Sequence, residues 1–181
     1  MGRVRDTILF GDCRETLKEF DGKARTCVTS PPYYGLRDYG GEESQIGQEQ
    51  TPEEYIQNLV EVFRSVRDVL TDDGTLWVNI GDSYYNYRPG KGQALPKQTV
   101  SKTKQDLPDK CAKRGNKLEG LKEKDLIGIP WMLAFALRAD GWYLRQDIIW
   151  HKPNPMPESV KDRCTKSHEY IFLLSKNRKY Y

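Results

Sequence analysis

The most chemically distinctive stretch of the sequence is Ser30-Pro31-Pro32-Tyr33, which follows a short apolar run. The apolar run predicts a buried strand at 26–28 that ends just before Ser30. Each proline fixes its own φ and donates no backbone hydrogen bond, so a stiff, extended turn is expected. The Ser30 hydroxyl and the Pro31 carbonyl could then both accept from one planar NH2 group. The Tyr33 ring could stack on the flat ring that carries this group.

This stretch resembles the catalytic motif of the DNA amino-methyltransferases, which methylate the exocyclic nitrogen of cytosine or adenine. Further matches follow in the family's order, from Gly11-Asp12 to Leu174, so the resemblance spans nearly the whole chain. The resemblance implies an extruded base, S-adenosylmethionine as methyl donor and double-stranded DNA as partner. It implies catalytic roles for Ser30, Pro31, Pro32 and Tyr33, and a base pocket lined by Asp12, Asn79, Gly81 and Asp82.

Several elements must position these residues. Strands are predicted at 7–10, 75–80, 142–150 and 169–174, in addition to the one before Ser30. A helix is predicted after Asp12, because Asp12 and Glu15 have the spacing of a capping box, so Asp12 could be a cap, a site residue or both. The best-defined helix starts at Thr51-Pro52-Glu53-Glu54 and ends at 71–74. Its apolar stripe is predicted to be core: Ile56, Leu59, Val60, Phe63, Val66 and Leu70.

A third helix is predicted over 129–139, with Gly141 as its stop. Strands and helices that alternate in this way predict an α/β fold with two βαβ units. The resemblance specifies a partial doubly wound, Rossmann-like methyltransferase sheet. Ligands of open α/β sheets bind beyond the carboxyl ends of the strands, which is where Ser30 and Asp82 would meet. Alternatively, Asp82 only begins a loop. The Gly-rich stretch 35–49 is predicted to be a mobile loop over this edge.

The positive charge of the chain is concentrated in residues 86–124. This segment has eleven Lys and Arg against four Asp and Glu, a net charge of +7, whereas the rest has 18 against 22, a net charge of −4. Such a segment suggests a polyanionic partner, although a solvated loop would look the same. The loop after the strand at 142–150 also resembles the family's DNA-facing loop. The DNA-binding residues expected are Arg88, Lys91, Lys97, Lys102, Lys104, Lys113, Arg114, Lys152 and Asn154.

Length and composition exclude several classes of protein. The 181 residues predict one domain, and the mean hydropathy of −0.78 with 30% charged residues leaves no run of membrane-spanning length. No signal-peptide pattern precedes the first expected strand, so a cytoplasmic protein is predicted. The four cysteines have no CxxC spacing and only two histidines occur, which argues against a metal site. A Pro-Cys pair, as used for methylation of a ring carbon, is also missing.

The Gly-rich turn that would bind S-adenosylmethionine, usually Phe-x-Gly-x-Gly in this family, does not occur in the sequence. Only 29 residues precede Ser30, too few for a cofactor half, so the resemblance is to the permuted β group, in which the catalytic half comes first. Residues 1–181 are therefore predicted to be a catalytic half, with the segment 86–124 inserted and the cofactor half missing. A non-catalytic nucleic-acid-binding fragment is the alternative. Ser-Pro-Pro-Tyr favours cytosine N4 as the target over adenine N6, and a restriction-modification role is expected.

Overall fold

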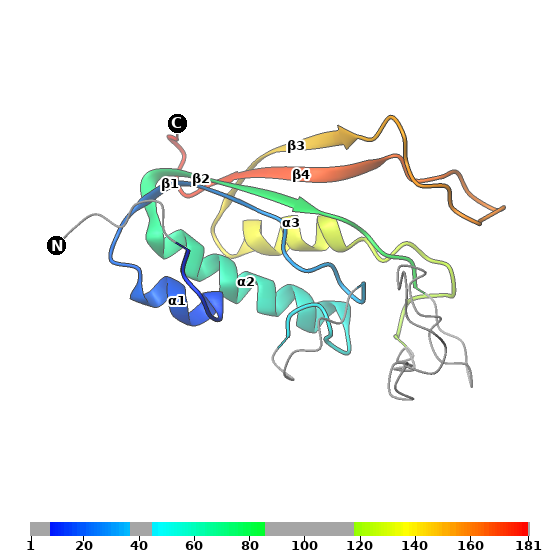
Figure 1. The fold of residues 1–181 in the computed structure, drawn as a ribbon, viewed down its shortest axis with the longest axis horizontal. Helices are drawn as coiled ribbons and strands as arrows, with labels where there is room; N and C mark the ends of the chain where they lie inside the picture. Colours follow the sequence, from blue (N-terminus) through cyan, green and yellow to red (C-terminus); the bar gives the residue numbers. More distant parts are fainter. Residues whose placement is uncertain (1–7, 37–44, 86–117, 181) are drawn as a thin grey trace.

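The computed structural model describes residues 8–36, 45–85 and 118–180 (Figure 1). Three helices and four strands lie in these ranges. In chain order they are α1 (Cys13–Glu19), β1 (Ala24–Thr29), α2 (Pro52–Val69), β2 (Leu70–Ile80), α3 (Ile129–Ala139), β3 (Tyr143–His151) and β4 (His168–Ser175). This is the α/β fold expected from the sequence.

The four strands form one mixed sheet in the order β1-β2-β4-β3. β1 and β2 are parallel and are joined by α2, which confirms the second of the two predicted βαβ units. β4 lies between β2 and β3 and is antiparallel to both. As a result, the first residues of β4 lie at the same edge of the sheet as the last residues of β1 and β2.

All three helices lie on one side of the sheet (Figure 1). Alternate residues of β2 face them, because successive strand residues point to opposite faces. Leu76, Val78 and Ile80 are buried under the helices, whereas Trp77 and Asn79 face the other side and are partly exposed. No helix of the described ranges covers that second face.

Helix α2 begins and packs as the sequence predicts. The Thr51 hydroxyl accepts from the backbone N–H of Glu54 at 3.2 Å, and the Glu54 carboxylate accepts from the backbone N–H of Thr51 at 3.3 Å. Both halves of the capping box are therefore present. The predicted stripe is buried against the sheet: Ile56, Leu59, Val60, Phe63, Val66 and Leu70.

The prediction of a strand at 7–10 is wrong for residues 8–10, the part of this run that the structure describes. Residues 8–10 have no strand structure, and the side chains of Ile8 and Phe10 are 77% and 88% exposed. The first predicted βαβ unit is therefore not formed by the described residues. An apolar run of this length has strand propensity, but it forms a strand only where a neighbouring strand accepts its hydrogen bonds.

Two further predictions need correction at the strands. β1 was expected to be buried, but among the described residues it is an edge strand, and the side chain of Val28 is 76% exposed. Helix α2 ends at Val69 and β2 begins at Leu70, although the helix was expected to end at 71–74 and the strand to begin at Thr75. Residues 71–74 bulge out of the pairing, because Ala24 lies opposite Leu70 and Thr26 opposite Thr75. A Cβ atom at Gly74 would lie 2.9 Å from the Thr71 carbonyl oxygen, so the glycine permits a close local approach in this bulge.

Single residues mark the start of helix α1 and the end of helix α3. Asp12 caps α1 by accepting from the backbone N–H of Arg14 at 2.9 Å. The predicted reciprocal bond from Glu15 is not formed, since the Glu15 carboxylate pairs with Lys18 at 3.0 Å instead. Helix α3 ends as predicted, with Gly141 at φ 102°, a left-handed conformation that favours glycine. None of the described helices is long and apolar enough to cross a membrane.

Candidate nucleic-acid site at the carboxyl ends of the strands

The Ser30-Pro31-Pro32-Tyr33 stretch follows β1 directly and is anchored from two other segments. The Tyr55 hydroxyl on α2 donates to the Pro32 carbonyl at 2.7 Å. The Ser83 hydroxyl, beyond β2, donates to the Tyr34 carbonyl at 3.1 Å. Burial raises the pKa of Tyr55, which keeps its hydroxyl protonated as a donor. These bonds hold the turn in place, as two prolines alone would not.

The next loop is fixed to the same turn at its base. The backbone N–H of Gly35 donates to the Gly47 carbonyl at 2.8 Å. Gly47, at φ 99°, lies close to the Tyr33 carbonyl, where a Cβ atom would be 3.2 Å away. The Tyr34 ring packs on Tyr55 at a centroid distance of 5.4 Å, and burial raises the pKa of Tyr34 to about 12. Most of the loop predicted to be mobile, residues 37–44, lies outside the described residues.

This turn has two hydrogen-bond acceptors in neighbouring positions. They are the Ser30 hydroxyl, which also hydrogen-bonds to the Tyr33 side chain, and the carbonyl of Pro31, which is a buried residue. Ser30 is exposed, and its hydroxyl is a side-chain acceptor at the end of β1. No described residue donates a hydrogen bond to the Pro31 carbonyl, whereas the adjacent Pro32 carbonyl already has a donor in Tyr55. The turn therefore offers two neighbouring acceptors, which suits a planar group with two N–H donors.

Gly81 supports the ring of Tyr33 at the end of β2. A Cβ atom at position 81 would lie 2.6 Å from Cε2 and 3.0 Å from Cδ2 of that ring, which is too close for any side chain. Gly81 is buried. The sequence therefore needs glycine here for a close approach between backbone and ring, and the two residues predicted to share a site are in contact.

The hydroxyl of Tyr33 is bound by polar groups of two strands. Its single O–H proton is shared between two acceptors, Asn79 Oδ1 at 3.1 Å and Glu169 Oε2 at 3.3 Å. Lys152 donates to the other carboxylate oxygen of Glu169. Burial raises the pKa of Tyr33, the Ser30 side chain lowers it by hydrogen bonding, and the negative charge of Glu169 raises it further. The phenol is therefore neutral and acts as a donor near pH 7.

Asp82 lies at the same edge but its carboxylate is occupied. Oδ1 accepts from the backbone N–H groups of Ser83 at 2.9 Å, Gly128 at 3.0 Å and Ile129 at 3.0 Å. The N-cap residue of α3 is Gly128, which has no side chain to cap the helix, and Asp82 fulfils that role from the end of β2.

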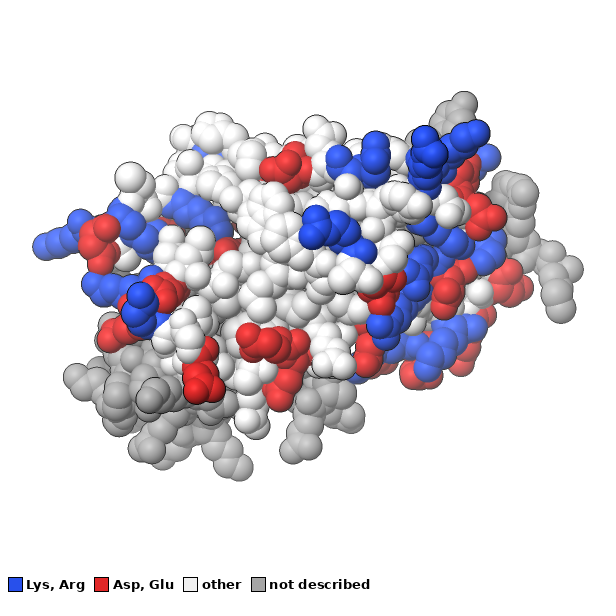
Figure 2. Space-filling view, turned by 180° about the vertical axis from the view of Figure 1, so that it is seen from behind, with Lys and Arg blue, Asp and Glu red and all other residues white. Residues whose placement is uncertain are grey.

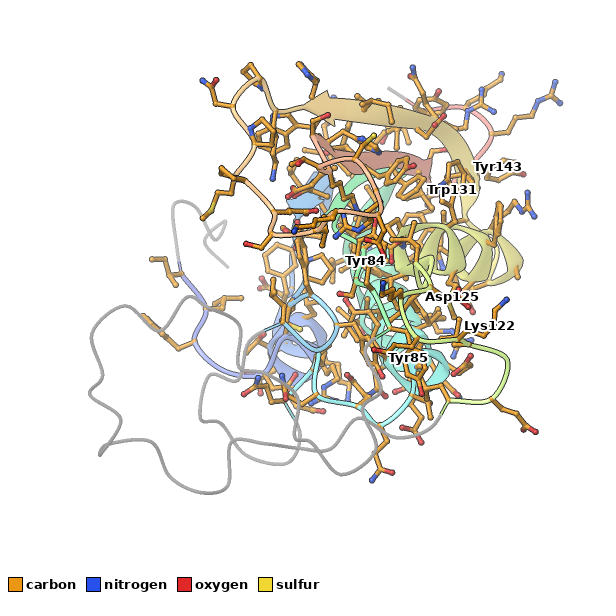
Figure 3. All side chains as sticks on the ribbon, turned by 90° about the vertical axis from the view of Figure 1, so that its right-hand side faces the viewer. Tyr84, Tyr85, Lys122, Asp125, Trp131 and Tyr143 are labelled. Carbon is orange, nitrogen blue, oxygen red and sulfur yellow. The ribbon has the colours of Figure 1, made fainter. Side chains whose placement is uncertain are left out.

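Residues just beyond Asp82 form a stem with the segment before α3 (Figure 3). Tyr84 and Leu126 make an antiparallel bridge, and the backbone N–H of Tyr85 donates to the Asp125 carbonyl at 2.8 Å. The Tyr85 hydroxyl accepts from the backbone N–H of Leu118 at 2.9 Å. The two ends of residues 86–117 are therefore held together beside the candidate site.

Most of the predicted DNA-binding residues cannot be placed. Residues 86–117, between the two ends of the stem, lie outside the described residues. They include Arg88, Lys91, Lys97, Lys102, Lys104, Lys113 and Arg114. Lys152 is described and reaches the site through Glu169, and Asn154 is exposed two residues further on. Seen from behind, the described part has Lys and Arg interspersed with Asp and Glu at both ends and mostly uncharged side chains across the middle, with a few charged ones among them (Figure 2).

Asp12 is not joined to the other predicted pocket residues by any contact between described residues. Its carboxylate pairs with Arg14, with 2.5 Å between Oδ2 and Nη2. Hydrogen bonds from Arg14 lower the pKa of Asp12 to about 2. Asp12 was predicted to be a helix cap, a site residue or both, and the structure shows the helix cap.

Glu169 and Tyr55 belong to the site but were not predicted from the sequence. Tyr55 lies one position before the apolar stripe of α2, where nothing suggests a hydroxyl contact. Glu169 is a carboxylate at the start of an otherwise apolar strand, which is a usable signal. It could have been used only with the knowledge that β4 is antiparallel, which places its first residues next to the last residues of β2.

Within the described ranges, no three His, Cys, Asp or Glu residues are grouped so as to hold a metal ion. The described cysteines, Cys13, Cys27 and Cys164, are free thiols. The polar groups around the motif are hydroxyls, the Pro31 carbonyl, the Asn79 amide, the Glu169 carboxylate and the Lys152 ammonium. This set suits hydrogen bonding to a base and a phenol–base stack.

Relatives with known names share most of this chain. It is 54% identical over 180 residues to the type II methyltransferase M.SmaI of Serratia marcescens, covering 96% of this chain and 57% of that protein. It is 53% identical over 176 residues to the type II methyltransferase M.Cfr9I of Citrobacter freundii, covering 97% and 56%. The chain therefore spans somewhat more than half the length of these relatives.

Solved structures with low sequence identity share the fold. The PvuII DNA methyltransferase, named as cytosine-N4-specific, superposes with a TM-score of 0.59 at 16% identity, covering 94% of this chain and 49% of that one. The protein TTHA0409 of Thermus thermophilus, complexed with S-adenosyl-L-methionine, superposes with a TM-score of 0.58 at 22% identity, covering 94% and 53%. A family model described as DNA methylase, N6_N4_Mtase, matches residues 24–181. The chain therefore belongs to this family of DNA methylases.

Proposed function

We propose that the chain is the base-binding half of a DNA methyltransferase that acts on an exocyclic amine of an extruded base. The observation that carries the proposal is the pair of neighbouring acceptors, the Ser30 hydroxyl and the Pro31 carbonyl, beside the ring of Tyr33 on Gly81. A base with an NH2 group matches this arrangement, because its two N–H donors meet two acceptors. Its flat ring can also stack on the phenol.

The chain's residues would act on the amine by orientation and polarisation. The lone pair of an exocyclic amine is delocalised into the ring, so the amine is a weak nucleophile. Hydrogen bonds from both N–H groups to Ser30 and Pro31 would localise that pair and aim it away from the ring plane. When bound, S-adenosylmethionine supplies a methyl group on a positively charged sulfur. The proton that the amine loses goes to water, because the Ser30 hydroxyl is a poor base.

We place the cofactor-binding half outside these 181 residues. The sequence has no glycine-rich turn after a strand, so the residues present do not fit the cofactor's usual cradle. The chain also spans only 57% of M.SmaI. A half-domain of this kind would take the target base and need a second half to hold the methyl donor. The missing turn equally favours the alternative function, a nucleic-acid-binding fragment without catalysis.

Cytosine N4 is the target that we propose, with adenine N6 as the alternative. Position 30 is a serine, and the family resemblance associates Ser-Pro-Pro-Tyr with cytosine-N4 enzymes more often than with adenine enzymes. The PvuII enzyme, whose fold is similar, is named as cytosine-N4-specific. The chemistry of the acceptors does not distinguish the two amines, because both bases carry a ring nitrogen acceptor beside the NH2 group.

The DNA backbone would contact the segment 86–124, Lys152 and Asn154. The segment has a net charge of +7, and its two ends are held beside the site by the contacts of Tyr85. Basic side chains near the phosphates would supply most of the sequence-independent affinity.

A chimaera tests the proposed function directly. The chain would be joined to the part of M.SmaI that lies beyond the aligned region, and incubated with unmodified DNA and isotope-labelled S-adenosylmethionine. Nucleoside mass spectrometry should detect N4-methylcytosine from the chimaera and none from the same chimaera with Ser30→Ala. Adenine methylation alone would refute the choice of base. Methylation by neither protein, with DNA binding retained, would support the non-catalytic alternative.

A further inference from the structure

Glu169 is an ionisable residue that contacts the Tyr33 hydroxyl, and the proposed chemistry assigns it no role. It is the second residue of β4, and β4 pairs antiparallel with β2 so that Tyr170 lies opposite Ile80. This register places Glu169 at the edge where β1 and β2 end. Its side chain is 20% exposed, which is low for a carboxylate.

Both oxygens of this carboxylate are engaged, and by different segments. Oε2 accepts from the Tyr33 hydroxyl at 3.3 Å. Oε1 accepts from Lys152, which follows β3. Burial works to raise the pKa of Glu169, but hydrogen bonds from Lys152, Asn79 and Tyr33 hold it below its ordinary value. A charged acceptor makes a stronger bond to the phenol than a neutral one would.

The ring of Tyr33 is restrained at two places. Gly81 lies against its Cε2–Cδ2 edge, where a Cβ would be 2.6 Å away. The hydroxyl at the far end of the ring is held by Asn79 and Glu169. The amide of Asn79 is itself oriented, because its Nδ2 donates to the Tyr170 carbonyl at 3.2 Å. The contact with Gly81 fixes the position of the ring, and the hydrogen bonds of the hydroxyl fix the direction of the ring's long axis.

We propose that Glu169 is a positioning residue that, held by Lys152, sets the orientation of the Tyr33 ring for stacking on the target base. This inference rests on the proposed function as far as the base is concerned. The orientation of Tyr33 itself is a property of the chain without DNA. Lys152 is therefore assigned a role inside the site as well as near the DNA.

The orientation is tested first without nucleic acid, in the full 181-residue chain. Tyrosine labelled with carbon-13 at Cζ reports the phenol, and Tyr33→Phe assigns its signal. In Glu169→Gln the pKa of Tyr33 should fall, because the negative charge that raises it is removed. In Glu169→Ala the Tyr33 signal should also shift and broaden at neutral pH. The matched control is Glu158→Gln, which removes a carboxylate that pairs with Arg163 in the β3–β4 connection.

The second arm uses DNA in which 5-iodocytosine replaces cytosine throughout, so that no recognition sequence need be known. Light cross-links an iodinated base to an aromatic ring stacked on it. The yield at Tyr33 should fall about tenfold in Glu169→Ala, as expected when one hydrogen bond to a charged group is removed. Glu169→Gln, which keeps an acceptor oxygen, should restore most of the yield. The control variant should match the wild type.

The outcomes separate the two proposals. An unchanged Tyr33 signal and titration in both Glu169 variants, each still folded by circular dichroism, would overturn the positioning role. So would a wild-type cross-link at Tyr33 whose yield Glu169→Ala does not reduce. If the wild type cross-links nowhere, base stacking and the proposed function fail, while the carbon-13 signal still decides whether Glu169 orients the ring.

Discussion

The carboxylate of Asp82 at the end of β2 caps helix α3, accepting from the backbone N–H groups of Gly128 and Ile129 at 3.0 Å each. We expect Asp82→Ala to lower the free energy of unfolding by about 1–2 kcal/mol, because the helix start loses its acceptor. Asp82→Asn keeps one acceptor oxygen and should lose less. Urea unfolding measures both, with Asp162→Ala, an exposed partner of Lys124, as control. A wild-type midpoint for Asp82→Ala would contradict the capping role.

Gly81→Ala should displace the ring of Tyr33, since the new Cβ would lie 2.6 Å from it. Overpacking of this kind costs about 1–3 kcal/mol of stability. The cost should be smaller when Tyr33→Ala is already present, because the clash is then removed. A double-mutant cycle by urea unfolding checks this, and equal costs in the two backgrounds would show that the ring is not the cause.

Ser30→Ala should leave the fold intact, because Ser30 is exposed at the end of β1. In the M.SmaI chimaera, it removes one of the two acceptors for the amine. We expect the rate of methyl transfer to fall by a factor on the order of 10², comparable with the loss of one preorganised hydrogen-bonding group in other enzymes. Single-turnover kinetics would show this, and a wild-type rate would make Ser30 only a turn residue.

Changing two lysines of the segment 86–124, for example Lys97 and Lys102, to glutamine should weaken the salt dependence of DNA binding. The slope of log affinity against log salt should flatten by roughly 0.9 for each phosphate that the protein no longer neutralises. Fluorescence anisotropy at several salt concentrations measures the slope. The same change at Lys18 and Lys179 lowers the net charge equally and should leave the slope as it is. Equal slopes in both variants would exclude the segment as the main phosphate-binding region.

The stability of the fold should depend on Asp12 in acid. Hydrogen bonds from Arg14 lower the pKa of Asp12 from its ordinary 3.8 to about 2. Because the pKa is lower in the folded state, this contribution is fully present above the ordinary value and disappears as the pH falls through the folded one. As the pH falls from 3.8 to about 2, the Asp12→Asn variant should therefore lose less free energy of unfolding than the wild type. Thermal unfolding over this range measures it, and an unchanged pH profile would contradict the link.

Local signals predicted most of the described secondary structure. Thr51 and Glu54 predicted the start of α2, because a capping box depends only on neighbouring residues. Gly141 predicted the end of α3 for the same reason, since the left-handed φ that terminates a helix favours glycine. Ser30 and Asp82 were expected at one edge, because the carboxyl ends of parallel strands meet there. The family resemblance placed Asn79 and Gly81 in the same pocket, but it did not predict their contacts with Tyr33.

What the sequence did not predict depends on contacts between distant segments. The run at 8–10 is apolar, but strand formation needs a neighbour, and no local signal reports one. The position of β4 between β2 and β3 likewise depends on which strands pair with each other, and no local signal reports this. Glu169 was missed for this reason, although it lies 3.3 Å from the hydroxyl that the motif supplies.

The stem formed by Tyr84, Tyr85, Leu118 and Leu126 makes the residues that it closes interchangeable. Because Tyr85 and Leu118 are bonded to each other, a stretch of any length can be inserted between them without changing the ends of β2 and α3.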